Sequence, residues 1–424
     1  MFDNVEAGEA LRDRPFNEER IAASERMKGF IEAALVGLAE YQQRNGSRKR
    51  RRKAADQVRW ENAVEAIICD LCYQALTEPE RGIAICRSKG QLGRNSRYRS
   101  SILGKQFPVI VDALASLDYL AEDRGGRRYG NAGRASVIWP GSRLRQEVGR
   151  RWIELSDIGI NLPRETIILK SGKNPDDYFS KADMVEYEDT STTIRRRTQV
   201  DALNSWLDNA DIRLAQHSEV DPDIGRRGLR RIFTNQSFDN GGRLYGGFWQ
   251  NMRKEERPRI RINGTFCVEI DYGQMNPRIA YGLAGAADCT EDAYLIPGLE
   301  DHRNGVKRVM NAMFFSTKPL GKFPKGTRSL FAPEFRIENV TRLIEDAHPA
   351  LSGFFYSGAG HHLQHIESEI MVDVMLRLKS VGVVALPIHD AVIVPEDEEF
   401  VAIDIMKDAF RRHVGSEGIV DVRG

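Results

Sequence analysis

Apolar residues recur at helical intervals in several stretches of the chain. Between residues 15 and 43 their spacing is three, four or six, and Gly46 follows the last of them (Ile21, Met27, Ile31, Leu35 and Leu38). Residues 57–77, 107–123, 193–210 and 302–318 show similar periodicity. We therefore expect a helix over each range, the one at 193–210 turning Ile194, Val200, Leu203 and Leu207 inward.

Apolar and β-branched runs without helical spacing predict strands, mostly in the second half of the chain. Residues 266–270 form one such run, which ends at Asp271 and leads into a helix-like stretch up to residue 285. Residues 381–386 and 391–394 form two more, and we expect a hairpin with His389 and Asp390 at its tip. Helices and strands together predict an α/β (α+β) protein.

Four segments divide the chain. Residues 1–85 form a basic helical region, 86–145 a winged-helix-like domain, 146–240 a connector, and 241–424 a region that contains the most distinctive motifs. The second segment resembles a winged helix because an amphipathic helix is followed by two short strands around an Asn-Ala-Gly turn. Cations surround these elements, which suits DNA, although a winged helix can also serve protein contacts (Arg94, Arg97, Arg99, Lys105, Arg127, Arg128 and Arg134).

Charge is distributed unevenly along the chain, although the net charge over 424 residues is only +1. Residues 1–150 contain 27 Lys and Arg against 20 Asp and Glu, whereas the remainder contains 35 against 41. Residues 44–53 contain seven cations and no anion, including Arg50, Arg51 and Arg52. The run predicts a nucleic-acid-binding arm, and a solvated loop between two helices is the alternative.

Composition excludes several classes of protein. A hydrophobic fraction of 41% supports a normal core, and the apolar runs are too short to span a bilayer. The N-terminus lacks the pattern of a secretory signal, and five cysteines do not form a disulfide framework. We therefore expect a cytoplasmic protein that does not bind membranes.

Three segments contain candidate chemistry. Asp271 at a strand end is a potential metal ligand, although an Asp that caps the following helix has the same pattern. His389-Asp390 at a hairpin tip is either catalytic or structural. In residues 302–318, side chains four apart lie on one helical face and could hold a nucleotide; the alternative is an ordinary surface helix (Arg303, Lys307, Asn311 and Phe315).

In this order the segments resemble motifs A, B and C of family A nucleic-acid polymerases. DYGQMNPRIAYGLAG, from Asp271, is similar to the family's DYSQIELRVLAHLSG, and the R-x3-K-x7-[YF] pattern is met by Arg303, Lys307 and Phe315. LQHIESEI places Gln364 on the Gln of the family's QGTAADI helix. FDNGGRLYGG resembles the D-x-x-G-R-x-Y segment of single-subunit RNA polymerases (Asp239, Arg243 and Tyr245). The resemblance covers about residues 226–424.

The resemblance implies a right-hand palm with an antiparallel sheet and short helical fingers. Two Mg²⁺ ions about 4 Å apart would be held by Asp271, Asp390 and the backbone carbonyl of Tyr272. Lys307 would act on the phosphates and the leaving pyrophosphate. The incoming nucleoside triphosphate would meet Arg303, Phe315, Asn276 and Asn311, and template or primer would meet Arg243, Tyr245, Gln364 and His389.

The chain departs from the family pattern at positions that govern sugar choice and metal binding. Asn276 stands where DNA polymerases have Glu and RNA polymerases have Gly, Phe315 replaces Tyr, and Ala391 replaces the Glu after His-Asp. We favour a DNA-directed DNA polymerase without proofreading exonuclease, in replication of a mobile or phage-like element. The alternatives are a single-subunit RNA polymerase or primase and, outside enzymes, a DNA-binding initiator or regulator with an inactive palm.

Overall fold

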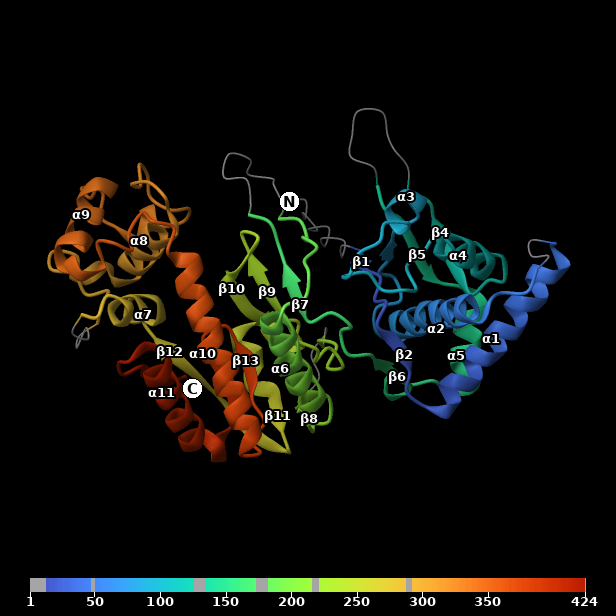
Figure 1. The fold of residues 1–424 in the computed structure, drawn as a ribbon. Helices are drawn as coiled ribbons and strands as arrows, with labels where there is room; N and C mark the ends of the chain where they lie inside the picture. The colour runs from blue at the N-terminus through green and yellow to red at the C-terminus, as the bar shows by residue number, and fades with distance from the viewer. Residues whose placement is uncertain are drawn as a thin grey trace, which may run out of the picture. The chain divides into compact units, whose positions relative to one another are not determined.

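The chain folds into two compact units in the computed structural model, residues 1–164 and 165–424, and each is described separately (Figure 1). The structure describes residues 13–46, 50–125, 134–172, 182–215, 221–286 and 292–423. Helices and mostly antiparallel sheets occur in both units, which makes the protein a member of the α+β class.

The first unit surrounds one hydrophobic core with helices and a small sheet. The sheet has the strand order β1-β3-β5-β4, and β2 pairs with β6 separately. Its helices are α1 (Glu25–Arg44), α2 (Ala54–Thr77), α3 (Lys89–Leu92), α4 (Phe107–Ser116) and α5 (Ser142–Arg151). Its strands are β1 (Arg14–Pro15), β2 (Arg20–Ala22), β3 (Ile83–Ile85), β4 (Leu120–Asp123), β5 (Ser136–Pro140) and β6 (Ile158–Ile160).

A fully buried carboxylate fastens the segment that contains β1 and β2 to α2. Asp70 Oδ1 accepts a hydrogen bond from Arg20 Nε at 2.8 Å, and its Oδ2 accepts from Arg14 Nη1 and from the backbone N–H of Asn17 at 3.0 Å. Buried charge is tolerated when it is paired and hydrogen-bonded in this way. Asp70 therefore ties β1 and β2 to the centre of the unit.

Several sequence expectations for this unit differ from the structure. The helix expected over 107–123 ends at Ser116, and residues 120–123 form strand β4, because Asp118 adopts a left-handed turn with φ of 60°. Val109, one of the apolar residues from which the periodicity of residues 107–123 was inferred, is 42% exposed. The helix expected from residue 15 begins at Glu25, where Ser24 caps it, and Ile21 belongs to β2. The segments expected over residues 1–85 and 86–145 both belong to this unit.

The second unit combines two sheets with long helices. A six-stranded sheet has the order β13-β14-β12-β11-β8 with β15 also paired to β12, and a three-stranded sheet has the order β10-β9-β7. The strands are β7 (Ile167–Leu169), β8 (Ile212–Leu214), β9 (Arg230–Thr234), β10 (Ser237–Tyr245), β11 (Ile260–Ile262), β12 (Thr265–Gly273), β13 (Leu386–Ile388), β14 (Ala391–Pro395) and β15 (Ile419–Arg423). The helices are α6 (Ser191–Asp208), α7 (Met275–Leu283), α8 (Arg303–Phe315), α9 (Ile337–Ala347), α10 (Gly360–Ser380) and α11 (Glu399–Val414).

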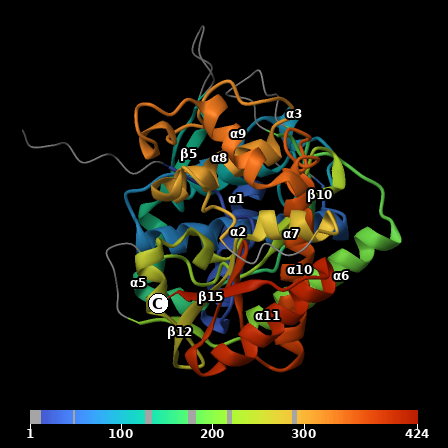
Figure 2. The ribbon, with the colours of Figure 1, turned by 90° about the vertical axis from the view of Figure 1, so that its left-hand side faces the viewer.

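Strand β12 lies at the centre of the larger sheet. It pairs with β14 on one side and with β11 and then β15 on the other. Figures 1 and 2 show α8 and α9 together at one end of the unit and α11 with β12 at the other, and α10 is long enough to approach both. This arrangement allows α10 to support the site described below.

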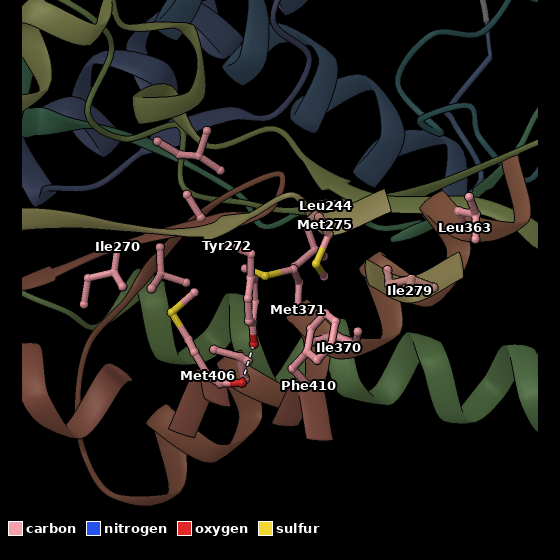
Figure 3. Close-up of a cluster of buried hydrophobic side chains, with 14 of the residues drawn as sticks. Leu244, Ile270, Tyr272, Met275, Ile279, Leu363, Ile370, Met371, Met406 and Phe410 are labelled. Atoms are coloured by element: carbon pink, nitrogen blue, oxygen red, sulfur yellow. Dashed lines mark hydrogen bonds between the residues drawn. The ribbon is translucent and has the colours of Figure 1, made fainter. Parts of the chain in front are cut away.

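A buried cluster under β12 holds the strand in place (Figure 3). Tyr272 is 2% exposed, and its hydroxyl donates a hydrogen bond of 2.6 Å to the backbone carbonyl of Met406 in α11. Its ring also packs on Phe410, with centroids 5.7 Å apart. Because successive residues of a strand face opposite sides, anchoring Tyr272 directs Asp271 to the other face of the sheet.

Two expectations for the second unit are wrong in detail. Ile194 is 52% exposed, although Val200, Leu203 and Leu207 of the same helix are buried as expected. Residue 381 follows the end of α10, so the strand predicted from there begins only at Leu386. The connector expected over 146–240 contributes α6 and strands β7, β8 and β9 to the core of this unit.

Candidate functional site

Strand pairing brings the motif A and motif C aspartates together. Asp271 near the end of β12 is the Cα partner of Ala391 in β14, and the backbone N–H of Tyr272 donates to the carbonyl of Asp390 at 3.0 Å. Asp271 is 5% exposed, whereas Asp390 is half-buried. Two carboxylate residues 119 positions apart in sequence thus have neighbouring backbones, Asp271 on β12 and Asp390 in the turn that precedes β14.

The hairpin that contains Asp390 has an unusual backbone. Ile388 pairs with Ala391, so His389 and Asp390 form a two-residue turn, as the sequence predicts. His389 has φ of 52°, a left-handed conformation that costs a non-glycine residue about 1 kcal/mol. Its ring packs edge-on against Tyr245 of β10, with centroids 5.6 Å apart. Such strain commonly marks functional positions, and here the conformation of His389 sets the direction in which the backbone enters Asp390.

Arg243 lies beside this hairpin but is already bound within the protein. Its Nε and Nη2 donate to the two carboxylate oxygens of Glu367 at 2.5 and 2.7 Å, and Glu367 is 1% exposed. The Gln364 amide oxygen, in its favourable orientation, accepts from Arg243 Nη1 at 2.8 Å. Burial alone would lower the pKa of Arg243, but the hydrogen-bonded Glu367 raises it, so the guanidinium is charged.

A second arginine network fixes β9 and β10 to α10. Arg231 is fully buried and donates from Nε to the carbonyl of Gly242 at 2.9 Å and from Nη2 to Ser368 and Glu369 at 3.0 and 2.9 Å. Arg196 of α6 pairs with the same Glu369 at 3.1 Å. Gly242 has φ of +89°, and a Cβ there would lie 2.8 Å from Ser368 Oγ, so glycine is needed. The network positions α10 against the strands that bear Arg243 and Tyr245.

Two cations of α8 lie close to the ring of Tyr294. Arg303 and Lys307 are both exposed, with Arg303 Cζ 5.4 Å and Lys307 Nζ 5.9 Å from the ring centroid of Tyr294. Arg303 Nε also donates to Asp292 Oδ2 at 2.5 Å. Burial raises the pKa of Tyr294, the Arg303 guanidinium lowers it, and the charges of Asp292 and Asp390 raise it. Tyr294 therefore interacts electrostatically with Arg303 of α8 and, as the smallest of these effects, with Asp390.

The remaining motif B side chains contact two other helices. Asn311 Oδ1 accepts from Asn276 Nδ2 of α7 at 3.1 Å, while Asn276 Oδ1 is buried with no hydrogen-bond partner among the described residues. Phe315 packs edge-on against His361 at the start of α10, with centroids 4.9 Å apart. Arg303, Lys307, Asn311 and Phe315 thus follow one helix from Tyr294 towards α10, the spacing expected from the sequence.

Three residues of this region were missed by the sequence analysis. Tyr294 and Asp292 precede motif B in a segment without periodic pattern, and only their position before the helix could have drawn attention to them. Asp421 in β15 is the Cα partner of Asp271, and a Cβ on Gly273 would lie 3.2 Å from its Oδ2. Its signal was the alternating pattern of residues 419–422, which reads as a strand.

The donor set can be compared with the needs of a metal ion. Within the described ranges, no three His, Cys, Asp or Glu side chains form a group that could hold a metal ion alone. Asp271 on β12 and Asp390 in the adjacent hairpin turn still offer hard oxygen ligands. Mg²⁺ commonly takes one or two carboxylates and completes its shell with water and substrate phosphates. The pair therefore suits Mg²⁺ that arrives with a nucleotide.

The predicted nucleic-acid contacts of the first unit are distributed over separate segments. Arg50 and Arg51 are exposed, whereas Arg52 stacks on Trp60 of α2 with Cζ 4.0 Å from the ring centroid. Arg97 is half-buried in the segment between α3 and α4. Two further cations of the predicted wing lie outside the described residues (Arg127 and Arg128).

No helix in the described part of the chain is both long and apolar enough to cross a membrane.

Comparison with known proteins gives little further information. No protein-family profile and no curated protein matches the chain. Among the solved structures that match is one described as "POL domain of Pol1 from M. smegmatis complex with DNA primer-template and dNTP", at 15% identity and a TM-score of 0.30. The match covers 55% of this chain and 50% of that chain, so it spans half the length of that domain. The likeness is too distant to define a fold or an activity, and the proposal below depends on the site residues.

Proposed function

We propose that the chain is a template-directed nucleotidyltransferase, with DNA-directed DNA synthesis as its reaction. One observation carries the proposal: Asp271 on β12 and Asp390 in the adjacent hairpin turn belong to neighbouring backbone segments, and the cations Arg303 and Lys307 flank Tyr294, whose pKa the charge of Asp390 helps to raise. Paired carboxylates next to cations suit phosphoryl transfer, which depends mainly on positioning and charge stabilisation. The primer-template and the nucleoside triphosphates would be its partners.

In this proposal each residue has a defined task. Asp271 and Asp390, with the backbone carbonyl of Tyr272, would hold two Mg²⁺ ions, which activate a 3′-oxygen and stabilise the leaving pyrophosphate. Lys307 would neutralise the phosphates and supply a proton to the pyrophosphate. Arg303 would exchange the carboxylate of Asp292 for an outer phosphate of the nucleotide, since one charged oxygen replaces another.

Discrimination between ribose and deoxyribose of the incoming nucleotide would take place near α7. Asn276 has an amide oxygen with no partner among the described residues, and its Nδ2 is held by Asn311 of motif B. A buried acceptor of this kind can bind a hydroxyl group, which makes a ribonucleotide polymerase or primase the second candidate. Deoxynucleotide and ribonucleotide substrates must therefore be compared directly.

The proposal is tested by primer extension with a labelled primer-template and Mg²⁺, using dNTPs and rNTPs in parallel and a lane without primer. We expect Asp390→Asn to reduce extension roughly 10³-fold, because several kcal/mol of charge stabilisation is lost. Asp397→Ala, which removes an exposed carboxylate beyond the same hairpin, should retain activity. Extension that does not depend on Asp390 would refute the assignment, and DNA binding without extension would favour a regulator with an inactive palm.

A further inference from the structure

A cavity of about 260 Å³ lies in the first unit, between α2 and the segment that precedes α4. Its floor is apolar and includes Ala63, Ile102 and Ile110, and its wall includes the indole of Trp60. Its volume is just below the range of roughly 300–1,000 Å³ common for drug-sized ligands, so a single nucleotide unit is a suitable size. The cavity belongs to the first unit alone and is separate from the carboxylate site.

Positive charge predominates around this cavity. Arg52, Arg59 and Lys105 line it against one carboxylate, Asp56, whose oxygen lies 3.6 Å from Arg59 Nη1. Arg59 and Lys105 are exposed, and Lys105 forms no ion pair with any described residue. Cations around a concave apolar floor attract anions, because low-dielectric walls strengthen the field inside.

One cation is held in position in advance. The Arg52 guanidinium stacks on Trp60 with Cζ 4.0 Å from the ring centroid, and its Nη2 donates to Gln42 Oε1 of α1 at 2.7 Å. Stacking and hydrogen bonding together restrict the side chain, which lowers the entropy lost when it binds a ligand.

We propose that this cavity binds the phosphate of a nucleotide unit, with Arg59 and Lys105 as donors, Arg52 as a fixed cation and the Trp60 ring as part of the wall. The phosphate could belong to a nucleic-acid strand or to a free nucleotide, and the chemistry of recognition is the same. This inference does not rest on the proposed polymerase activity, which resides in the other unit.

The test measures binding to the full-length protein by fluorescence anisotropy. The probe is a short single-stranded oligonucleotide labelled at its 3′ end, with either a 5′-phosphate or a 5′-hydroxyl, and unlabelled dTMP, dTTP and inorganic phosphate serve as competitors. The variants are Arg59→Gln and Lys105→Gln, each of which removes an exposed cation that lines the cavity. Arg145→Gln, which removes an exposed cation of α5 outside the cavity, is the matched control.

We expect each cavity variant to weaken binding of the phosphate ligand about tenfold, the lower end for a charge-assisted hydrogen bond, and the control to change it less than about twofold. If a preference for the 5′-phosphate oligonucleotide disappears in the variants, the cavity binds the end of a strand. If the variants weaken binding of the 5′-phosphate and 5′-hydroxyl oligonucleotides equally, it binds a backbone phosphate. If the variants change only the competition by dTMP and dTTP, it binds a free nucleotide. Unchanged binding in Arg59→Gln and Lys105→Gln, whose side chains are exposed and whose folding is verified by thermal melting, overturns the proposal. Equal weakening in Arg145→Gln also overturns it, because the effect would then reflect general charge.

Discussion

Replacing Arg243 with methionine should reveal whether this residue serves the structure or nucleic acid. Arg243 and Glu367 form a two-point ion pair whose side chains are 22% and 2% exposed. Removing one partner of a buried pair leaves the other charge without compensation, at a cost of about 3–5 kcal/mol. For a unit of this size each kcal/mol lowers the melting temperature by roughly 2–4 °C, so Arg243→Met should lower it by roughly 6–20 °C.

A mutant cycle followed by calorimetry can test whether the unpaired Glu367 charge causes this loss. Glu367→Gln added to Arg243→Met should restore most of the lost stability, because no buried charge remains. In Arg243→Met alone, burial keeps the folded-state pKa of Glu367 above its unfolded value. The loss should therefore be small below about pH 4, where the carboxyl is protonated, and should grow as pH rises. A deficit that is independent of pH, or that Glu367→Gln fails to relieve, would refute this reasoning.

Three further predictions follow from other parts of the structure. Gly242→Ala should cost more than about 2 kcal/mol in urea unfolding, because φ of +89° and the contact with Ser368 both oppose a Cβ; an effect below about 0.5 kcal/mol would contradict that geometry. Burial lowers the pKa of His365 to about 4. The contribution of the neutral imidazole to stability should therefore be complete above about pH 6.5 and should decline as pH falls towards 4. His365→Gln should flatten that part of a curve of unfolding free energy against pH. Cys86 is exposed and should react quickly with Ellman's reagent in the native protein, whereas Cys69 and Cys72 are buried in α2 with raised pKa values and should react only after unfolding.

Helices with a regular apolar face were the most predictable part of the fold. The expected helix at 57–77 is α2, and that at 302–318 is α8, each within three residues at either end. The pattern failed where local geometry decided the outcome. Asp118 adopts a left-handed turn that ends α4 and starts β4, although Leu117 and Leu120 continue the helical spacing. No periodicity could have revealed that turn.

The candidate site was predictable only as separate pieces of sequence. The strand that ends near Asp271 and the two-residue turn at His389-Asp390 could be read from the chain, because each depends on neighbouring residues. The pairing of β12 with both β14 and β15 could not, since it depends on contacts between distant segments. For the same reason the sequence indicated Arg243 as a nucleic-acid contact but gave no sign that Glu367 binds it.

The central position of β12 also has a consequence for how the protein is made. One partner strand, β15, is synthesised roughly 150 residues after β12, and at about 5–20 residues per second this interval lasts roughly 7–30 s. During that time β12 emerges with an open edge, which is a hazard for aggregation. The edge lacks this partner until residues 419–423 arrive, and the carboxylate pair is assembled only after residue 390 has been synthesised.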